Sequence, residues 1–154
     1  MWTDCWAFEQ LTARIEQMLR RLRENVDPEQ LARLCEALTK LYAGPFLGNE
    51  PDEPWSLPAR ERQRHRFMRA IGEACRYWQQ ANQPERAIDL LERALDIDNI
   101  AESFYRHLMT SYAQLGQNAD AAETYNRCRK TLAAVLKIEP SPETRALYDK
   151  LVRA

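Results

Sequence analysis

The chain has 154 residues, of which 45% are hydrophobic and 29% are charged, and its formal net charge is -1. This length favours one domain, 1–154, with a sizeable core, and the composition excludes an intrinsically disordered chain. The near-zero charge argues against a domain that binds nucleic acid through bulk positive charge. No apolar run reaches the ~20 residues of a membrane helix and no leader peptide opens the chain, so we expect a cytoplasmic protein without a membrane partner.

Two helices are predicted before the first long loop. Apolar residues recur at helical spacing over residues 4–23. A second helix starts after Asp27, which is a typical cap and is followed by proline, and its apolar stripe reaches Tyr42. Trp2 and Trp6 stand at the start of the first helix. They either contact a preceding domain or lie in the core, and the pattern leaves both alternatives open.

The segment 43–56 is the one long loop. It contains three prolines and two glycines, and also the aromatic residues Phe46 and Trp55. A simple linker seldom carries such large apolar side chains. We therefore predict an ordered loop in which Phe46 and Trp55 are largely buried against the helices.

Five more helices complete the expected fold, for a total of about seven and no sheet. The first begins near Pro58 and is rich in arginine. The next three cover residues 84–97, 101–115 and 119–136. The last begins after Ser141, which is a predicted cap with proline behind it.

From Phe67 to Cys128 the sequence repeats with a period of 34 residues. Adding 34 to Asn82 gives Gly116, and both residue types tolerate the left-handed conformation that ends a helix. This period and pattern are typical of the tetratricopeptide repeat, a pair of antiparallel helices. The sequence thus predicts an all-α fold of tetratricopeptide-like hairpins. The matched positions are Ile71 and Tyr105, Ala74 and Leu108, Cys75 and Met109, Trp78 and Tyr112, Ala87 and Ala121, Leu91 and Tyr125, and Ala94 and Cys128.

Nothing in the sequence predicts catalysis or a cofactor. The histidines, His65 and His107, stand in no catalytic motif, and no glycine-rich phosphate loop occurs. The four cysteines are far apart and form no C-x-x-C pair, which disfavours a metal site. Cys75 lies on a predicted buried stripe, so a thiol nucleophile is disfavoured as well.

The arginines between Arg60 and Arg69 have three interpretations: a solvated helix face, contact with an adjoining domain, or contact with phosphate. Arg62 and Arg66 share a face away from the apolar stripe and form the candidate interdomain face.

The first helix of each hairpin is expected to line a concave groove, and the side chains that flank its apolar stripe point into that groove. We expect a basic, amide-rich groove that binds a carboxylate-bearing segment. The alternative is that the chain's own helices fill the groove and that its arginines bind Glu73 or Glu102. The candidate groove residues are Arg69, Arg76, Gln79, Gln80, Ser103, Arg106, Thr110 and Gln114.

Several local strings, taken in order, resemble the bacterial transcriptional activator domain of antibiotic-regulatory (SARP-type) activators. The resemblance covers nearly the whole chain, although Lys137 stands where the family usually has glycine. It implies a tetratricopeptide-like regulatory domain that follows a winged-helix DNA-binding domain. The strings are Asp4-x-Trp6-x-Phe8, Tyr42-Ala43-Gly44-Pro45-Phe46-Leu47, Trp55 with Arg60, Ala101-Glu102 with Leu108-Met109, Tyr125-x3-Arg129-x2-Leu132, and Leu136-x3-Pro140-Ser141.

The leading hypothesis is a non-catalytic interaction domain within a larger bacterial transcription regulator. Its partners would be an adjacent DNA-binding or signalling domain, the transcription machinery or a second copy, with DNA contacted only through another domain. The alternatives are a free-standing peptide-binding adaptor and a domain that itself binds nucleic acid.

Overall fold

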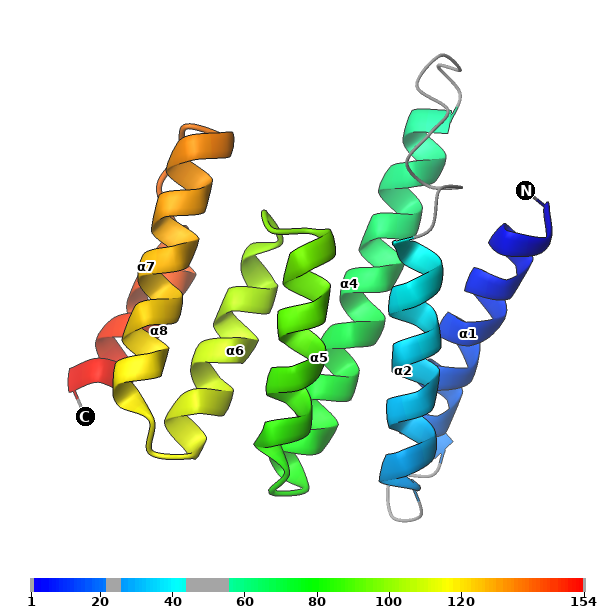
Figure 1. Ribbon diagram of the computed structural model, residues 1–154, viewed down its shortest axis with the longest axis horizontal. Coiled ribbons are helices and arrows are strands. Elements are labelled where there is room, and N and C mark those ends of the chain that lie inside the picture. Colours follow the sequence, from blue (N-terminus) through cyan, green and yellow to red (C-terminus); the bar gives the residue numbers. More distant parts are fainter. Residues whose placement is uncertain (1, 22–25, 44–55, 154) are drawn as a thin grey trace. The chain divides into compact units, whose positions relative to one another are not determined.

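A computed structural model describes residues 2–21, 26–43 and 56–153 of the chain. These residues form seven helices and no strand, which confirms the all-α prediction (Figure 1). None of these helices is long and apolar enough to cross a bilayer. The helices are α1 (Trp2–Arg21), α2 (Pro28–Tyr42), α4 (Ser56–Gln80), α5 (Pro84–Ile97), α6 (Glu102–Gln114), α7 (Asn118–Val135) and α8 (Pro142–Arg153).

Backbone contacts divide the chain into two compact units, Met1–Ala74 and Cys75–Ala154. The boundary falls inside α4, whose last turns therefore belong to the second unit. The single-domain interpretation of 1–154 is not tested by this division and stays a prediction. The predicted burial of Phe46 and Trp55 concerns residues outside the described part of the chain.

The first unit is held by aromatic and apolar contacts between α1, α2 and the first part of α4. The ring of Tyr42 stacks on that of Phe67 with 4.0 Å between centroids, and it lies 6.1 Å from the ring of Phe8. Phe8 and Phe67 are fully buried. The side chain of Trp6, in contrast, is 64% exposed, which rules out the core alternative for this residue.

The start of α2 matches its sequence signature. The Oδ1 atom of Asp27 accepts a hydrogen bond of 3.0 Å from the backbone N–H of Glu29, and Pro28 occupies the first turn. Proline is tolerated there because the N–H that it lacks would have no partner within the helix.

The second unit contains the repeat, and its turns follow the period of the sequence. Asn82 and Gly116 both adopt positive φ, of 61° and 76°. In each turn the following residue donates a backbone bond back into the helix, from Gln83 to the carbonyl of Trp78 (2.8 Å) and from Gln117 to that of Tyr112 (2.9 Å). Trp78 and Tyr112 thus occupy equivalent places at the ends of α4 and α6. These bonds form the Schellman motif that commonly ends helices.

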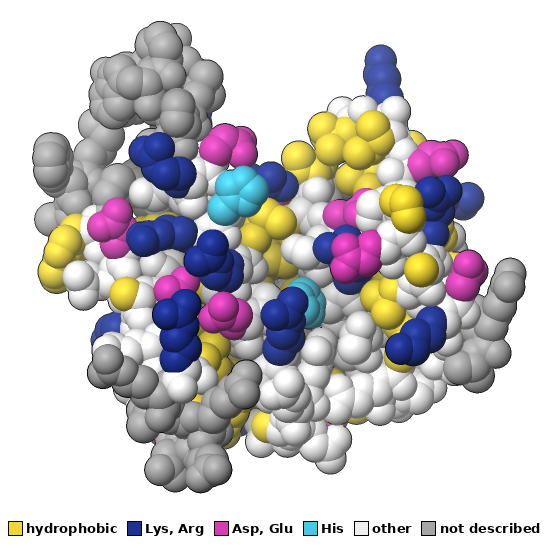
Figure 2. All heavy atoms as spheres, turned by 180° about the vertical axis from the view of Figure 1, so that it is seen from behind, with side chains coloured by type: hydrophobic (Ala, Val, Ile, Leu, Met, Phe, Trp, Pro, Cys, Tyr) yellow, Lys and Arg dark blue, Asp and Glu magenta, His cyan; other side chains and the backbone are white. Residues whose placement is uncertain are grey.

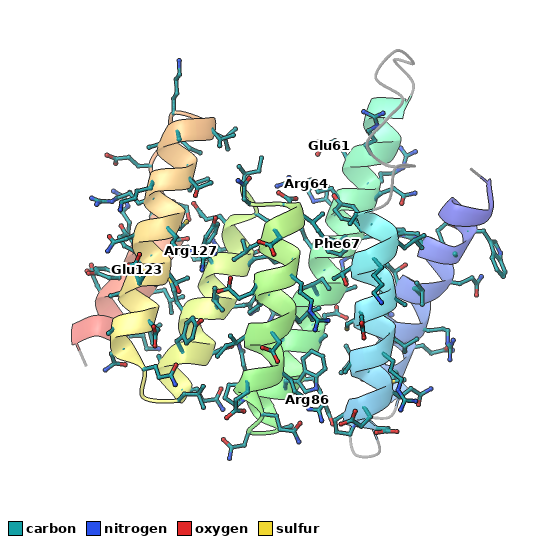
Figure 3. All side chains as sticks on the ribbon, in the orientation of Figure 1. Glu61, Arg64, Phe67, Arg86, Glu123 and Arg127 are labelled. Atoms are coloured by element: carbon teal, nitrogen blue, oxygen red, sulfur yellow. The ribbon has the colours of Figure 1, made fainter. Side chains whose placement is uncertain are left out.

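Packing in the second unit centres on α6, which contacts α5, α7 and α8. The small side chains of Ala87, Ala94 and Ala121 are fully buried, as close helix packing requires. Arg127 projects from α7 and forms a two-bond pair with Glu92 of α5, at 2.9 and 3.3 Å (Figure 3). The outer helices of successive hairpins are therefore linked by a charge pair as well as by α6.

The end of α7 carries Lys137 where the resemblance predicts glycine. Lys137 adopts φ 56°, the left-handed conformation for which glycine is usual. The backbone N–H of Ile138 donates to the carbonyl of Leu132 at 3.3 Å. The side chain of Tyr148 in α8 stacks on Tyr125 of α7 with 4.1 Å between centroids. The last helix thereby covers part of α7, as expected of a terminal helix in a repeat array.

We expect Gly116→Ala to lower the free energy of unfolding by about 1–2 kcal/mol, because the left-handed backbone disfavours a Cβ atom. Among the described residues, no atom beyond the two adjoining residues lies within 4 Å of the added Cβ, so the cost would come from the backbone conformation. Urea denaturation followed by circular dichroism measures this change. Asn82→Gly is the matched control at the equivalent turn and should not destabilise the protein. Equal stability of Gly116→Ala and the wild type would contradict the conformational argument.

Candidate interaction surface

The thiols of Cys35, Cys75 and Cys128 are buried. Cys75 is fully buried. Burial raises the pKa of Cys35 and of Cys128 to about 12, so neither is a thiolate near neutral pH. His65 is exposed on α4. Within the described ranges, no three His, Cys, Asp or Glu side chains are grouped so as to hold a metal ion.

The last turns of α4 lie directly against α6 and carry part of the predicted groove. Nε2 of Gln79 donates to the carbonyl oxygen of His107 (3.2 Å) and to Oγ of Ser111 (2.9 Å). Nε2 of Gln114 donates in return to the carbonyl oxygen of Gln79 (2.8 Å). These two amides were predicted to face a ligand, but the structure uses them to connect the first helices of the two hairpins.

Arg106 is engaged within the protein by a network at the junction of α6 and α8. Its Nη1 atom donates to Oε2 of Glu102 (3.1 Å) and to Oγ1 of Thr144 (3.0 Å), and its Nε atom lies 3.8 Å from Oε1 of Glu143. The alternative in which a groove arginine binds Glu102 therefore holds for Arg106. Its positive charge is largely balanced before any partner arrives.

The same carboxylate also holds the start of α8. Oε1 of Glu102 accepts a bond of 2.9 Å from the backbone N–H of Ser141, and Oε2 accepts one of 3.0 Å from the hydroxyl of Thr144. Oγ of Ser141 in turn accepts a bond from the backbone N–H of Thr144 at 3.4 Å, as the predicted cap requires. Burial alone would raise the pKa of Glu102, but these bonds and the charge of Arg106 outweigh it and lower that pKa.

Arg76 differs from Arg106 because its guanidinium is free. Arg76 and the neighbouring Gln80 are exposed, and neither has a hydrogen-bond or ion-pair partner among the described residues. Thr110 is half-buried and its hydroxyl donates to the carbonyl of Arg106 (3.0 Å). Ser103 is half-buried as well.

Arg69 and the candidate interdomain face belong to the first unit. Arg69 and Arg62 are exposed. Arg66 is also exposed and forms a long ion pair with Glu9 of α1, with 3.9 Å between Nη1 and Oε1. Exposed pairs of this kind contribute little to stability. Whether Arg69 shares a groove with Arg76 stays a prediction, because Arg69 and Arg76 lie in different units.

His107 is a residue of this surface that the sequence did not single out. It is half-buried, and its pKa is lowered from 6.5 to about 4 by burial and by the charges of Arg76 and Arg106. Its imidazole has no hydrogen-bond partner in the described part of the chain. No motif surrounds it, and the 34-residue period only aligns it with Glu73 in the preceding repeat.

These observations define a candidate surface within the second unit, which we call the α4–α6 surface. On the face drawn in Figure 2, Lys and Arg side chains are interspersed with Asp and Glu. The α4–α6 surface consists of Arg76, Gln80, Ser103, Arg106, His107 and Thr110.

A pocket of 420 Å³ opens elsewhere, between α5, α6 and α7, and none of the predicted groove residues lines it. Tyr105 lines this pocket and donates its hydroxyl to the carbonyl of Asn99 at 2.7 Å. Arg127 on its wall is already paired with Glu92. The hydroxyl of Tyr105 and the guanidinium of Arg127 are thus used within the fold.

Comparison with known proteins defines the class of this chain. The family model "Bacterial transcriptional activator domain" matches residues 3–152, so the chain belongs to that family. The transcriptional regulatory protein MoaR1 of Mycobacterium tuberculosis, and that of Mycobacterium bovis, is 38% identical over 66 residues. This match covers 43% of the chain and 21% of MoaR1, so the chain corresponds to only a part of that regulator.

A solved structure has the same fold. The structure of Mycobacterium tuberculosis EmbR in complex with a low-affinity phosphopeptide superposes with a TM-score of 0.70 at 24% sequence identity. The match covers 97% of this chain and 38% of the EmbR chain. It confirms the tetratricopeptide-like helical fold that the 34-residue period predicts.

We expect Glu102→Gln to lower the free energy of unfolding at pH 7 by about 1–3 kcal/mol, because hydrogen bonds to a charged group are lost. Since the pKa of Glu102 is lowered in the folded state, its contribution is present above its ordinary value of 4.5 and is lost as the pH falls below it. Urea denaturation at several pH values measures both effects. Glu143→Gln, at a side chain that is 77% exposed, is the control and should change stability little. An unchanged stability profile of Glu102→Gln would contradict the role of the network.

We expect the imidazole of His107 to titrate in NMR spectra with a midpoint at about pH 4. The unfolded state takes up this proton first, so the contribution of His107 to stability is present above pH 6.5 and is lost as the pH falls toward 4. Arg76→Gln should raise this pKa, because it removes one of the charges that lower it. Arg93→Gln, at an exposed residue of α5, is the matched control. Identical midpoints in Arg76→Gln and the wild type would show that Arg76 does not act on the ring.

Proposed function

We propose that this chain is a non-catalytic regulatory domain of a larger bacterial transcription regulator. The single observation that carries this proposal is the family match over residues 3–152. The partial coverage of MoaR1 and EmbR supports it, since both are longer proteins that contain a matching part. A regulator of transcription in bacteria works in the cytoplasm, where its DNA is.

In this proposal the domain contacts proteins, and another domain of the regulator binds DNA. The formal net charge of -1 and the mixture of acidic and basic side chains in Figure 2 do not suit binding of a polyanion. The partner would be an adjacent DNA-binding or signalling domain, the transcription machinery or a second copy. EmbR has been solved with a bound phosphopeptide, and this agrees with a polypeptide as the partner of a protein in this structural class.

The α4–α6 surface is the proposed place of contact, and a carboxylate-bearing segment is its proposed ligand. Arg76 supports this choice because it is exposed and free, whereas Arg106 is held by Glu102. An arginine fork binds carboxylates through charge-assisted hydrogen bonds. Gln80 beside it adds an exposed amide that can donate and accept.

We expect Arg76→Glu in the full-length regulator to reduce the expression of a reporter gene severalfold, because the reversed charge repels an acidic segment. Binding of the regulator to its promoter DNA should stay unchanged in a gel-shift assay. Arg93→Glu on α5 is the control with the same change of charge. The proposed surface is wrong if Arg76→Glu and Arg93→Glu give the same reporter signal as the wild type.

The alternatives give different results in the same system. A free-standing adaptor would have no in-frame DNA-binding domain, and the gene sequence settles this directly. A nucleic-acid-binding domain would make the isolated chain shift random duplex DNA in a salt-dependent way.

A further inference from the structure

The α4–α6 surface contains two arginines, but only one of them can take a new anion. The guanidinium of Arg106 already donates to Glu102 and to Thr144, and it also lies near Glu143. If Arg106 bound an anion of a partner, it would lose bonds that hold α8 on α6. The guanidinium of Arg76 forms no hydrogen bond or ion pair with the described residues. A bound carboxylate therefore has one free arginine available at this surface and needs a second donor.

His107 stands where that second donor is required. Its backbone carbonyl accepts the bond from Gln79, which lies one helical turn after Arg76 on the same helix. The turn of α4 that carries Arg76 is thereby placed next to His107. The imidazole is half-buried and has no hydrogen-bond partner in the described ranges. The positive charge of Arg76 contributes to lowering its pKa. It is held next to a cation without an anion between them.

We propose that Arg76 and His107 form an anion subsite in which one carboxylate of an acidic segment pairs with the guanidinium and accepts a hydrogen bond from a protonated imidazole. This inference rests on the proposed function, because it specifies how the α4–α6 surface binds such a segment. The proton comes from solvent: at a pH between the midpoints of the free and the bound protein, the imidazole takes up a proton as the carboxylate binds, and no covalent bond is made or broken.

The charges around His107 determine the direction of this coupling. In the free protein the two charged groups that act on the ring, Arg76 of α4 and Arg106 of α6, are both cationic and oppose its protonation. Glu143 of α8 lies against Arg106 and offsets part of that charge. A carboxylate placed between Arg76 and His107 reverses the local field and favours the imidazolium. By linkage, lowering the pH must then strengthen binding of the acidic segment through His107.

The test uses the 154-residue chain and a capped tetraglutamate peptide, with capped tetraglutamine as the neutral control. NMR spectra of the histidine rings are recorded across pH with and without saturating peptide. His107→Gln assigns the signal and also corrects for the titration of the peptide itself. We expect tetraglutamate to move the midpoint of His107 from about pH 4 to about pH 5 or higher.

The affinity measurements follow from the same coupling. If the midpoint moves from about 4 to about 5, the wild type should gain about twofold in affinity relative to His107→Gln on going from pH 7 to pH 5, and a larger shift would give a larger gain. Arg76→Gln should bind the peptide about tenfold more weakly at pH 7, because one charge-assisted pair is lost, whereas Arg93→Gln should bind as the wild type does.

The outcomes separate this inference from the function on which it rests. If tetraglutamate binds and perturbs residues of the α4–α6 surface while the midpoint of His107 stays at about 4, the subsite is wrong and the surface survives. If the peptide does not bind at millimolar concentration, both the subsite and the proposed acidic ligand are wrong. The NMR titration of the wild type measures the midpoint without any substitution, so its result does not depend on the folding of a variant.

Discussion

The carboxylate of Glu102 is the contact on which the junction of α6 and α8 depends. Its two oxygens accept bonds from the backbone of Ser141, the hydroxyl of Thr144 and the guanidinium of Arg106. Thr144 is fully buried, so its hydroxyl needs these partners to offset the loss of water. One side chain at the start of α6 thus fixes the last helix and occupies an arginine that would otherwise be available to a ligand.

The turns of the repeat impose a second constraint, because they decide which side chains of α4 and α6 face each other. Asn82 and Gly116 end the two helices with the same backbone geometry. The ends of α4 and α6 therefore occupy equivalent positions of the repeat. Nε2 of Gln79 donates to the backbone carbonyl of His107 in the next repeat. Lys137 shows that a non-glycine residue can adopt this conformation at the end of α7, at an energetic cost that the surrounding packing must offset.

In the proposed function, selective contact would depend on the distribution of charge and not on its total. A net charge of -1 attracts neither polyanions nor polycations strongly. Most of the strong charge pairs in the second unit, such as Arg127 with Glu92, are internal and hold helices together. Arg76, in contrast, is a free cation whose charge acts on the half-buried imidazole of His107. Selectivity for a carboxylate would come from the positions of Arg76 and His107 and not from the net charge of the domain. This would suit a domain that transmits a signal between proteins.

The sequence by itself determined the helices, the repeat and the family, because each depends on local or periodic patterns. The cap at Asp27 and the turns at Asn82 and Gly116 need only neighbouring residues, so they could be predicted from spacing alone. The candidate groove was predicted less completely. Only the tertiary structure decided that Gln79 and Arg106 are used internally, and that His107 is half-buried and subject to the charges of Arg76 and Arg106. Gln79 reaches partners 28 and 32 residues away, and Arg106 reaches Thr144 38 residues away as well as Glu102 on its own helix. No local pattern encodes which of several distant polar groups a side chain will reach.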